Sequence, residues 1–137
     1  MKVVFDTNCY FAAAARPNGY MYKWLETAVG GSNFTLYTSR EILFELQEKL
    51  EKKLRLSLSD SVYFCRYIED VSEVVYPTAR VCVVTNDPDD NKILECAVAA
   101  KANLIITFDN HLLKLKRYEE IVIAHPRMLK HWFSTVD

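Results

Sequence analysis

The sequence predicts an α/β fold: a single domain with a central, mostly parallel sheet of about four to five strands and helices on both faces. Short apolar runs rich in β-branched residues alternate with longer segments of helical periodicity, the order produced by parallel strands joined by helical crossovers. The chain has 137 residues, half of them hydrophobic, and only 3 glycines and 4 prolines. This composition suits one domain with a substantial core.

The first half of the chain is expected to supply two strands and four helices. Ser39 can cap the longest of these helices, in which Ile42, Leu46 and Leu50 give an apolar face. In chain order we predict a strand at 2–5, a helix through the alanine run to residue 15, a helix at 20–29, a strand at 34–37, a helix from 40 to about 54 and a helix from Ser59 to about residue 70.

The second half continues the alternation. Pro88 suits the first turn of a helix that Asn86 or Asp87 can cap, and the apolar run at 104–108 is typical of a buried parallel strand. We predict short extended runs at 71–76 and 81–84, a helix from Pro88 to about residue 100, a strand at 104–108, a short helix before residue 115, a charged link, a last strand at 121–124 and a closing helix opened by Pro126.

Four acidic residues fall where such a sheet binds ligands. Asp6 and Asp109 directly follow predicted strands, and the carboxyl ends of parallel strands lie along one edge. Asp90 precedes Ile93 by three residues, which places its carboxylate on or beside the core-facing stripe of its helix. Glu45 borders the apolar stripe of the helix at 40–54. All four can therefore meet at one edge of the sheet.

Each acid also has a simpler explanation. Asp6 can be the N-cap of the following helix, and from the residues alone this is as good an interpretation as a catalytic role. Asp109 can form a turn, and Asp90 can stabilise a first helical turn. Glu45 and Lys49 have the spacing of an exposed ion pair, which spacing alone favours. However, an ionised acid beside a buried stripe must be paired, hydrogen-bonded or metal-bound.

Four gathered carboxylates would raise one another's pKa values, so the cluster predicts bound cations. Two divalent ions would balance its charge, and oxygen ligands with no His or Cys nearby fit Mg²⁺ or Mn²⁺ rather than zinc. Two such ions can clamp a phosphodiester and activate water for in-line attack. Asn8 can cap a helix, or orient the neighbouring carboxylate and a metal-bound water.

The remaining composition restricts partners and compartment. The net charge of −1 gives no general attraction to nucleic acid, although KLEKKLRL is a locally basic segment that is either solvated or in contact with a phosphate backbone. No apolar run approaches the length of a membrane span. The cysteines lack CxxC spacing and lie in apolar contexts, which predicts buried free thiols and a cytoplasmic location: Cys9, Cys65, Cys82 and Cys96.

Four sequence stretches carry a resemblance to a known family. They are VVFDTN, RPNG, SREILFEL and DPDDNKILECAVAAKANLIITFDNHLL. Together they resemble the PIN domain, and most closely its VapC-like branch of toxin components of toxin–antitoxin systems. The similarity extends from residue 2 to about residue 115. The first and last stretches are specific in this order and spacing, whereas SREILFEL is weak by itself.

This resemblance implies a single PIN-like nuclease domain over residues 1–137 that uses Mg²⁺ or Mn²⁺ to hydrolyse RNA and leaves a 5′-phosphate and a 3′-hydroxyl. It implies a single-stranded or structured RNA substrate, an antitoxin partner and a homodimer in the cytoplasm. By position, the catalytic and metal-binding residues would be Asp6, Glu45, Asp90 and Asp109, supported by Asn8, Thr107 and Asp87. Glu45 thereby becomes a catalytic candidate rather than an exposed helix residue.

Two alternatives from other classes remain open. One is a non-catalytic RNA- or protein-binding module on the same fold. The other is a phospho-receiver domain, which would require an acidic pair after the first strand and an acceptor aspartate after a mid-chain strand. Only Asp6 follows the first strand, and the stretch at 34–38 ends without an acid, so the sequence disfavours this class.

Overall fold

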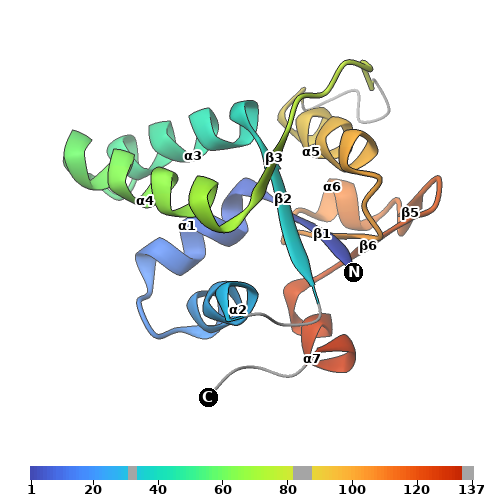
Figure 1. Ribbon diagram of the computed structural model, residues 1–137, viewed down its shortest axis with the longest axis horizontal. Coiled ribbons are helices and arrows are strands. Elements are labelled where there is room, and N and C mark those ends of the chain that lie inside the picture. The colour runs from blue at the N-terminus through green and yellow to red at the C-terminus, as the bar shows by residue number, and fades with distance from the viewer. Residues whose placement is uncertain (31–33, 82–87, 134–137) are drawn as a thin grey trace.

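A computed structural model describes residues 1–30, 34–81 and 88–133 of the chain (Figure 1). The helices and strands along these residues are β1 (Lys2–Phe5), α1 (Thr7–Ala15), α2 (Tyr20–Val29), β2 (Thr35–Ser39), α3 (Arg40–Lys52), α4 (Leu58–Val71), β3 (Glu73–Val75), α5 (Pro88–Ala100), β4 (Leu104–Ile106), α6 (Asn110–Leu113), β5 (Arg117–Tyr118), β6 (Ile121–Ala124), the 3-10 helix η1 (Pro126–Met128) and α7 (Leu129–Trp132).

The described strands form one sheet in the order β3-β2-β1-β4-β6-β5. All neighbours are parallel except β5 and β6, which form an antiparallel pair. The predicted mostly parallel sheet is confirmed, but with six strands the prediction of four to five is too low. The additional strand β5 lies in the segment predicted to be a charged link. It pairs only two residues at the sheet edge, too few to show a hydrophobic alternation.

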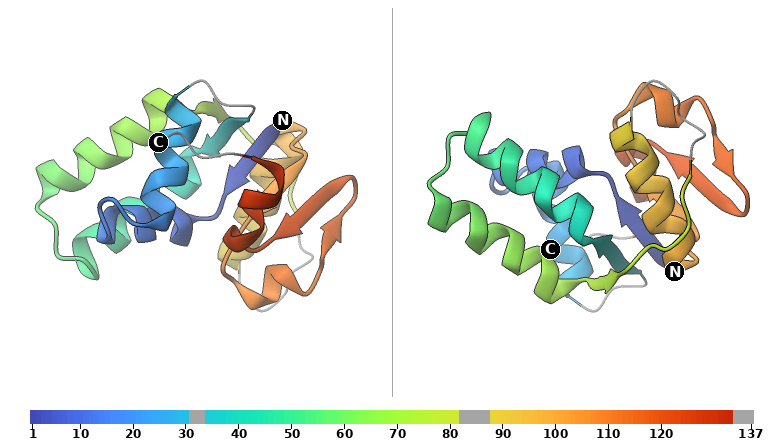
Figure 2. Two further views of the ribbon diagram at one scale, coloured as in Figure 1. Left: turned by 90° about the horizontal axis from the view of Figure 1, so that it is seen from below. Right: turned by 90° about the horizontal axis from the view of Figure 1, so that it is seen from above.

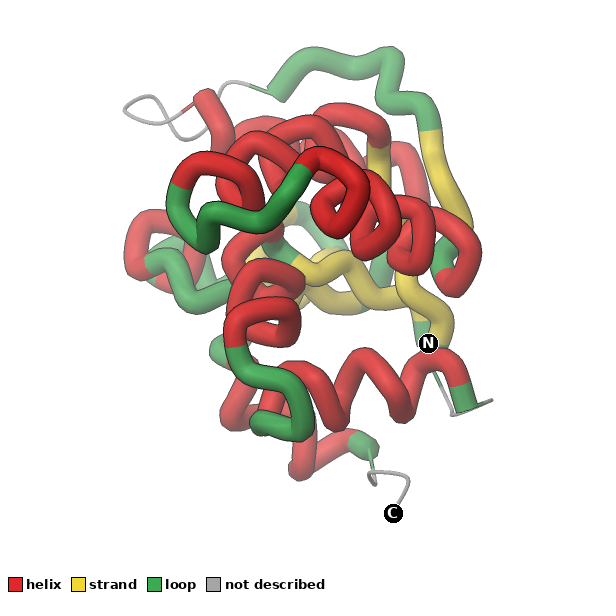
Figure 3. The backbone as a smooth tube through the Cα atoms, turned by 90° about the vertical axis from the view of Figure 1, so that its left-hand side faces the viewer, coloured by secondary structure: helices red, strands yellow, loops and turns green. Residues whose placement is uncertain are grey.

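Helices cover both faces of the sheet, as predicted. Helices α1 to α4 gather on one side of β1 and β2, and α5 lies on the other side (Figures 1 and 2). In Figure 3 the side with helices α1 to α4 faces the viewer, and these helices cover much of the sheet. Helix α5 contacts β1, β2, β3 and β4. Its buried Ile93, Leu94 and Ala97 join the core with Val3 and Ile105 of the central strands.

Several element boundaries follow directly from capping and periodicity. Helix α2 and strand β6 span the predicted residues, and the Ser39 hydroxyl caps α3 by accepting a hydrogen bond from the Ile42 N–H at 3.4 Å. Helix α4 begins before Ser59, because Ser57 is the residue whose hydroxyl accepts from the Asp60 N–H. Outside the described residues lie all but the first residue of the expected extended run at 81–84, and the proposed caps Asn86 and Asp87. No helix in the described ranges is long and apolar enough to cross a bilayer.

Candidate metal centre

The buried hydroxyl of Thr107 joins two of the expected acids. In the register of β1 and β4, Phe5 lies beside Ile106, so the residues that follow the two strands are neighbours. Thr107 Oγ1 donates a hydrogen bond of 2.6 Å to Asp6 Oδ2 and accepts one of 2.9 Å from the Asp109 N–H. Thr107 therefore links the Asp6 carboxylate directly to the backbone of Asp109.

Asp6 is a buried carboxyl group whose proton is held more tightly than usual. Burial raises the pKa of Asp6 above its ordinary value. The hydrogen bond from Thr107 opposes this rise, and the negative charges of Glu45 and Asp109 add to it. Asp6 does occupy the N-cap position of α1, but without a side-chain capping hydrogen bond. The backbone N–H of Thr7, the first residue of α1, also lowers the pKa of Asp6, so the carboxylate interacts with the helix end as well as with Thr107.

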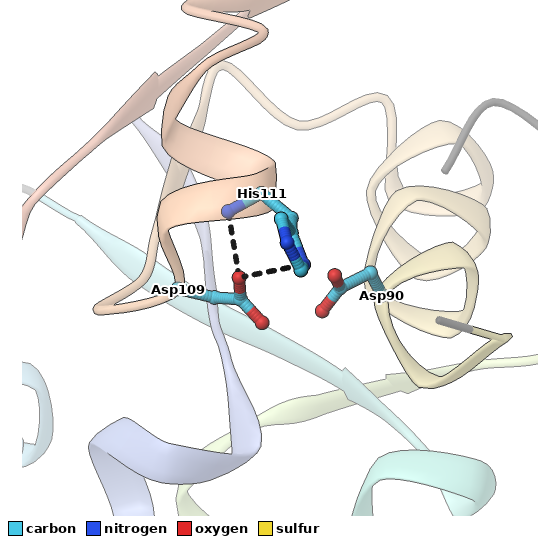
Figure 4. Close-up of side chains that lie close together, drawn as sticks. All are labelled: Asp90, Asp109 and His111. Carbon is cyan, nitrogen blue, oxygen red and sulfur yellow. Dashed lines mark hydrogen bonds and ion pairs between the residues drawn. The ribbon is translucent and has the colours of Figure 1, made fainter. Parts of the chain in front are cut away.

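The carboxylates of Asp90 and Asp109 approach each other from different elements. Asp90 lies buried in the first turn of α5, as its alignment with the core-facing stripe predicted, and Asp109 precedes α6. Both point into one space, toward which the His111 imidazole is also directed (Figure 4). One potential ligand atom from each of these three residues lies within 4.8 Å of the others.

His111 corrects the expectation that no histidine lies nearby. Asp109 Oδ1 accepts a hydrogen bond of 2.8 Å from the backbone N–H of His111. The ring nitrogen His111 Nδ1 lies 3.8 Å from the same oxygen. The carboxylate thus caps α6, so the simpler role considered for Asp109 coexists with its place in the cluster. The imidazole follows Asp109 by only two residues, and this proximity is the signal that the sequence offered.

Glu45 forms the ion pair that its spacing predicted, and it also lies near the acids. Lys49 Nζ lies 3.3 Å from Glu45 Oε2 and donates a hydrogen bond of 3.0 Å to Asn8 Oδ1. The charge of Glu45 contributes to the raised pKa of Asp6, which places both residues in one electrostatic environment. Asn8 thus accepts from Lys49, a contact not anticipated from the sequence. Asp87 lies outside the described residues.

This donor set is chemically suited to a divalent cation. Two carboxylates that face each other repel, and a hard cation between them relieves the repulsion while replacing the water that burial removes. Asp90 and Asp109 are the residues best placed to bind one, with His111 within reach of the same position. An imidazole nitrogen beside carboxylate oxygens suits Mn²⁺ and other first-row ions better than it suits Mg²⁺.

The molecule is therefore an α/β domain with an acidic site at the carboxyl edge of a mostly parallel sheet. A family model described as PIN domain matches residues 2–111, and the chain belongs to this family. Family membership confirms the resemblance and removes the phospho-receiver alternative.

Comparison with individual proteins agrees with this assignment. The chain is 35% identical over 120 residues to the uncharacterized protein MJ1680 of Methanocaldococcus jannaschii, covering 85% of this chain and 76% of that protein. Its fold is similar to VapBC2 from Rickettsia felis bound to a DNA fragment from their promoter (TM-score 0.63, 20% identity, 90% of this chain and 97% of that chain). It is also similar to VapBC-1 from nontypeable Haemophilus influenzae (TM-score 0.65, 15% identity, 93% and 99%).

Proposed function

We propose that this protein is a metal-dependent endoribonuclease, and that it is the VapC-like toxin component of a toxin–antitoxin pair. The observation that carries the proposal is the convergence of Asp90 and Asp109 beside the linked pair Asp6 and Thr107. Membership of the PIN domain family and the fold shared with VapBC proteins support it.

In this proposal Asp6, Asp90 and Asp109 would hold Mg²⁺ or Mn²⁺, and Glu45 would serve as a further ligand, directly or through water. Bound there, the cation would supply the Lewis acidity that activates water for attack on a phosphodiester. Thr107 keeps one oxygen of Asp6 oriented through its hydrogen bond. The 2′-hydroxyl of the RNA takes no part, so the products carry a 5′-phosphate and a 3′-hydroxyl.

A partly basic cavity beside Glu45 supports a nucleic-acid substrate. The cavity has a volume of about 400 Å³, and its lining residues are Glu41, Phe44, Glu45, Glu48, Lys49, Lys52, Lys53 and Lys92. Lysines at such a position can contact phosphates, and the exposed ring of Phe44 offers a surface on which an unpaired base can stack. The locally basic segment noted in the sequence thus adjoins the proposed site, which favours a single-stranded RNA in this cavity.

The proposed protein partners rest on the exposed apolar side chains of α3 and α4. These are Phe44, Leu58, Val62 and Tyr63. Such a patch is characteristic of an interaction surface, and a cognate antitoxin and a second copy of the chain are the proposed occupants. The proposed location of the complex is the cytoplasm.

The proposal is tested by incubating purified protein with single-stranded RNA and DNA in Mg²⁺, Mn²⁺ or EDTA. We expect cleavage of RNA with either metal, none in EDTA, and 5′-phosphate product ends. The Asp90→Asn protein, purified in parallel, controls for contaminating nuclease. Equal cleavage by wild type and Asp90→Asn contradicts the proposal, whereas RNA binding without cleavage by either protein supports the non-catalytic alternative.

A further inference from the structure

The Lys49 ammonium group is held by two partners from different helices. It lies 3.3 Å from Glu45 Oε2, one turn earlier in α3, and 3.0 Å from Asn8 Oδ1 in the first turn of α1. Asn8 follows Asp6 by two residues, so Lys49 connects α3 to the segment that carries the first acid. The amide of Asn8 fixes the ammonium group in a way that a simple helical ion pair would not.

The neighbouring ion pair on the same helix shows what is unusual about Lys49. Lys52 and Glu48 have the same spacing and the same 3.3 Å separation, but their side chains are 75% and 67% exposed. The side chains of Lys49 and Glu45 are only 25% and 15% exposed. Water screens a charge pair less as the pair becomes buried, so Lys49 neutralises Glu45 more effectively than Lys52 neutralises Glu48.

The positive charge of Lys49 changes the number of cations that the cluster needs. Glu45 already has a cationic partner in Lys49, whereas Asp90, Asp109 and His111 each offer a potential metal ligand within 4.8 Å of the others. A second divalent cation at Glu45 would have to displace the ammonium group or bind beside it, against its repulsion. One divalent cation together with Lys49 leaves the site close to balance without a second ion.

We propose that Lys49 is a resident cation of this site, so that the chain without RNA binds one divalent cation, at Asp90 and Asp109, and leaves Glu45 to Lys49. This inference rests on the proposed function. It revises the two-cation expectation drawn from the sequence and replaces direct binding of Glu45 to the metal by the pairing of Glu45 with Lys49. Lys49 is a positioning residue here: it holds Glu45 and limits cation binding.

Counting bound Mn²⁺ tests this inference without measuring cleavage. Free Mn²⁺ is followed by electron paramagnetic resonance during titration of wild type, Lys49→Met, Lys49→Arg and the matched control Lys52→Met. We expect one tightly bound ion in wild type, Lys49→Arg and Lys52→Met. In Lys49→Met we expect a second ion to bind at least about tenfold more tightly than any second ion in wild type, a difference of ~1.4 kcal/mol. Adding Glu45→Gln to Lys49→Met should restore a single ion.

Two results would overturn the inference. The first is an identical titration of Lys49→Met and wild type, and the second is a pair of equally tight ions in wild type. An Asp90→Asn arm separates these results from failure of the proposed function: if wild type binds no Mn²⁺, or if Asp90→Asn binds it as well as wild type does, the metal site itself is refuted. Circular dichroism checks that each variant is folded, and Lys49→Arg retains the charge if the methionine variant is not.

Discussion

Asp6 is a deeply buried residue that lies near the negative charges of Glu45 and Asp109. Its folded-state pKa lies above its ordinary value. At pH values between the two, the native chain therefore holds a proton that the unfolded chain has already released. In EDTA, the free energy of unfolding of wild type should therefore fall as the pH rises from the ordinary carboxyl pKa through the raised pKa of Asp6. Asp6→Asn removes the group that titrates, and this variant should lack that fall and be the more stable protein at pH 7.

The same substitution should abolish activity while it stabilises the fold. Even outer-sphere partners of a metal site typically contribute ten- to a hundredfold, so loss of a proposed ligand should lower cleavage by at least about a hundredfold. Chemical denaturation between pH 4 and 8, paired with an RNA cleavage assay, checks both effects. An Asp6→Asn protein that is less stable than wild type throughout this range would show that the Asp6 charge is fully compensated in the metal-free fold.

Thr107 offers a second test at the residue scale. Thr107→Val keeps the shape but removes the donor to Asp6 and the acceptor for the Asp109 N–H. The loss of these buried hydrogen bonds should cost about 1–3 kcal/mol of unfolding free energy. It should also raise the pKa of Asp6 further, because the Thr107 hydrogen bond is what lowers it. The pH at which activity is half-maximal should therefore rise.

Thr107→Ser is the matched control, because it keeps the hydroxyl and loses only a methyl group. Urea denaturation and a pH profile of RNA cleavage measure the two effects separately. If the valine and serine variants share one pH profile, the hydroxyl does not set the ionisation of Asp6.

At the scale of elements, helix α3 carries both a buried residue that should affect stability and an exposed residue that should affect RNA binding. Leu46 faces the core and is fully buried, whereas Phe44 is 68% exposed and lines the partly basic cavity. Leu46→Ala should lower the free energy of unfolding by roughly 2–5 kcal/mol through lost burial and the cavity it leaves. Phe44→Ala should change it by less than about 0.5 kcal/mol, as is usual for an exposed side chain.

RNA affinity, unlike stability, should depend on Phe44. If a base stacks on the ring, Phe44→Ala should weaken binding of a short single-stranded RNA by ~1–3 kcal/mol, whereas Phe44→Trp should preserve it. Fluorescence anisotropy with labelled RNA in Ca²⁺ or EDTA measures this without cleavage. Equal affinity in the alanine and tryptophan variants would remove Phe44 from the substrate path.

The elements that the sequence predicted well are those with a strong local signal. Helix α2 and strand β6 were placed correctly because their apolar spacing and flanking residues agree. Strand β5 was missed because Arg117 and Tyr118 gain their strand conformation from pairing with β6, not from their own pattern. The start of α4 was displaced because Ser57 and Ser59 are both adequate caps and only three-dimensional geometry distinguishes them.

For the whole molecule, topology explains why part of the site could be predicted. Parallel strands with right-handed crossovers bring the residues after β1 and β4 to one edge, so the meeting of Asp6, Thr107 and Asp109 followed from the order of elements. The direction in which a long side chain points, and the partner it contacts, do not follow from the order of elements. Lys49 could have remained in solvent as Lys52 does, and His111 could have faced away from Asp90; packing decides both.

Cation binding should be visible in the stability of the entire fold, because its ligands come from segments that are far apart in the unfolded chain. The proposed ligands Asp6, Asp90 and Asp109 lie on three separate segments, so the unfolded chain has no comparable site. Mn²⁺ at a hundred times its dissociation constant should stabilise the folded state by about 2.7 kcal/mol. For a chain of this size, that corresponds to a rise in Tm of roughly 10 °C. Differential scanning fluorimetry with Mn²⁺ and with EDTA measures the shift, and Asp90→Asn should show little or none. A rise in Tm of the same size in Asp90→Asn would mean that Mn²⁺ stabilises the protein at some other place.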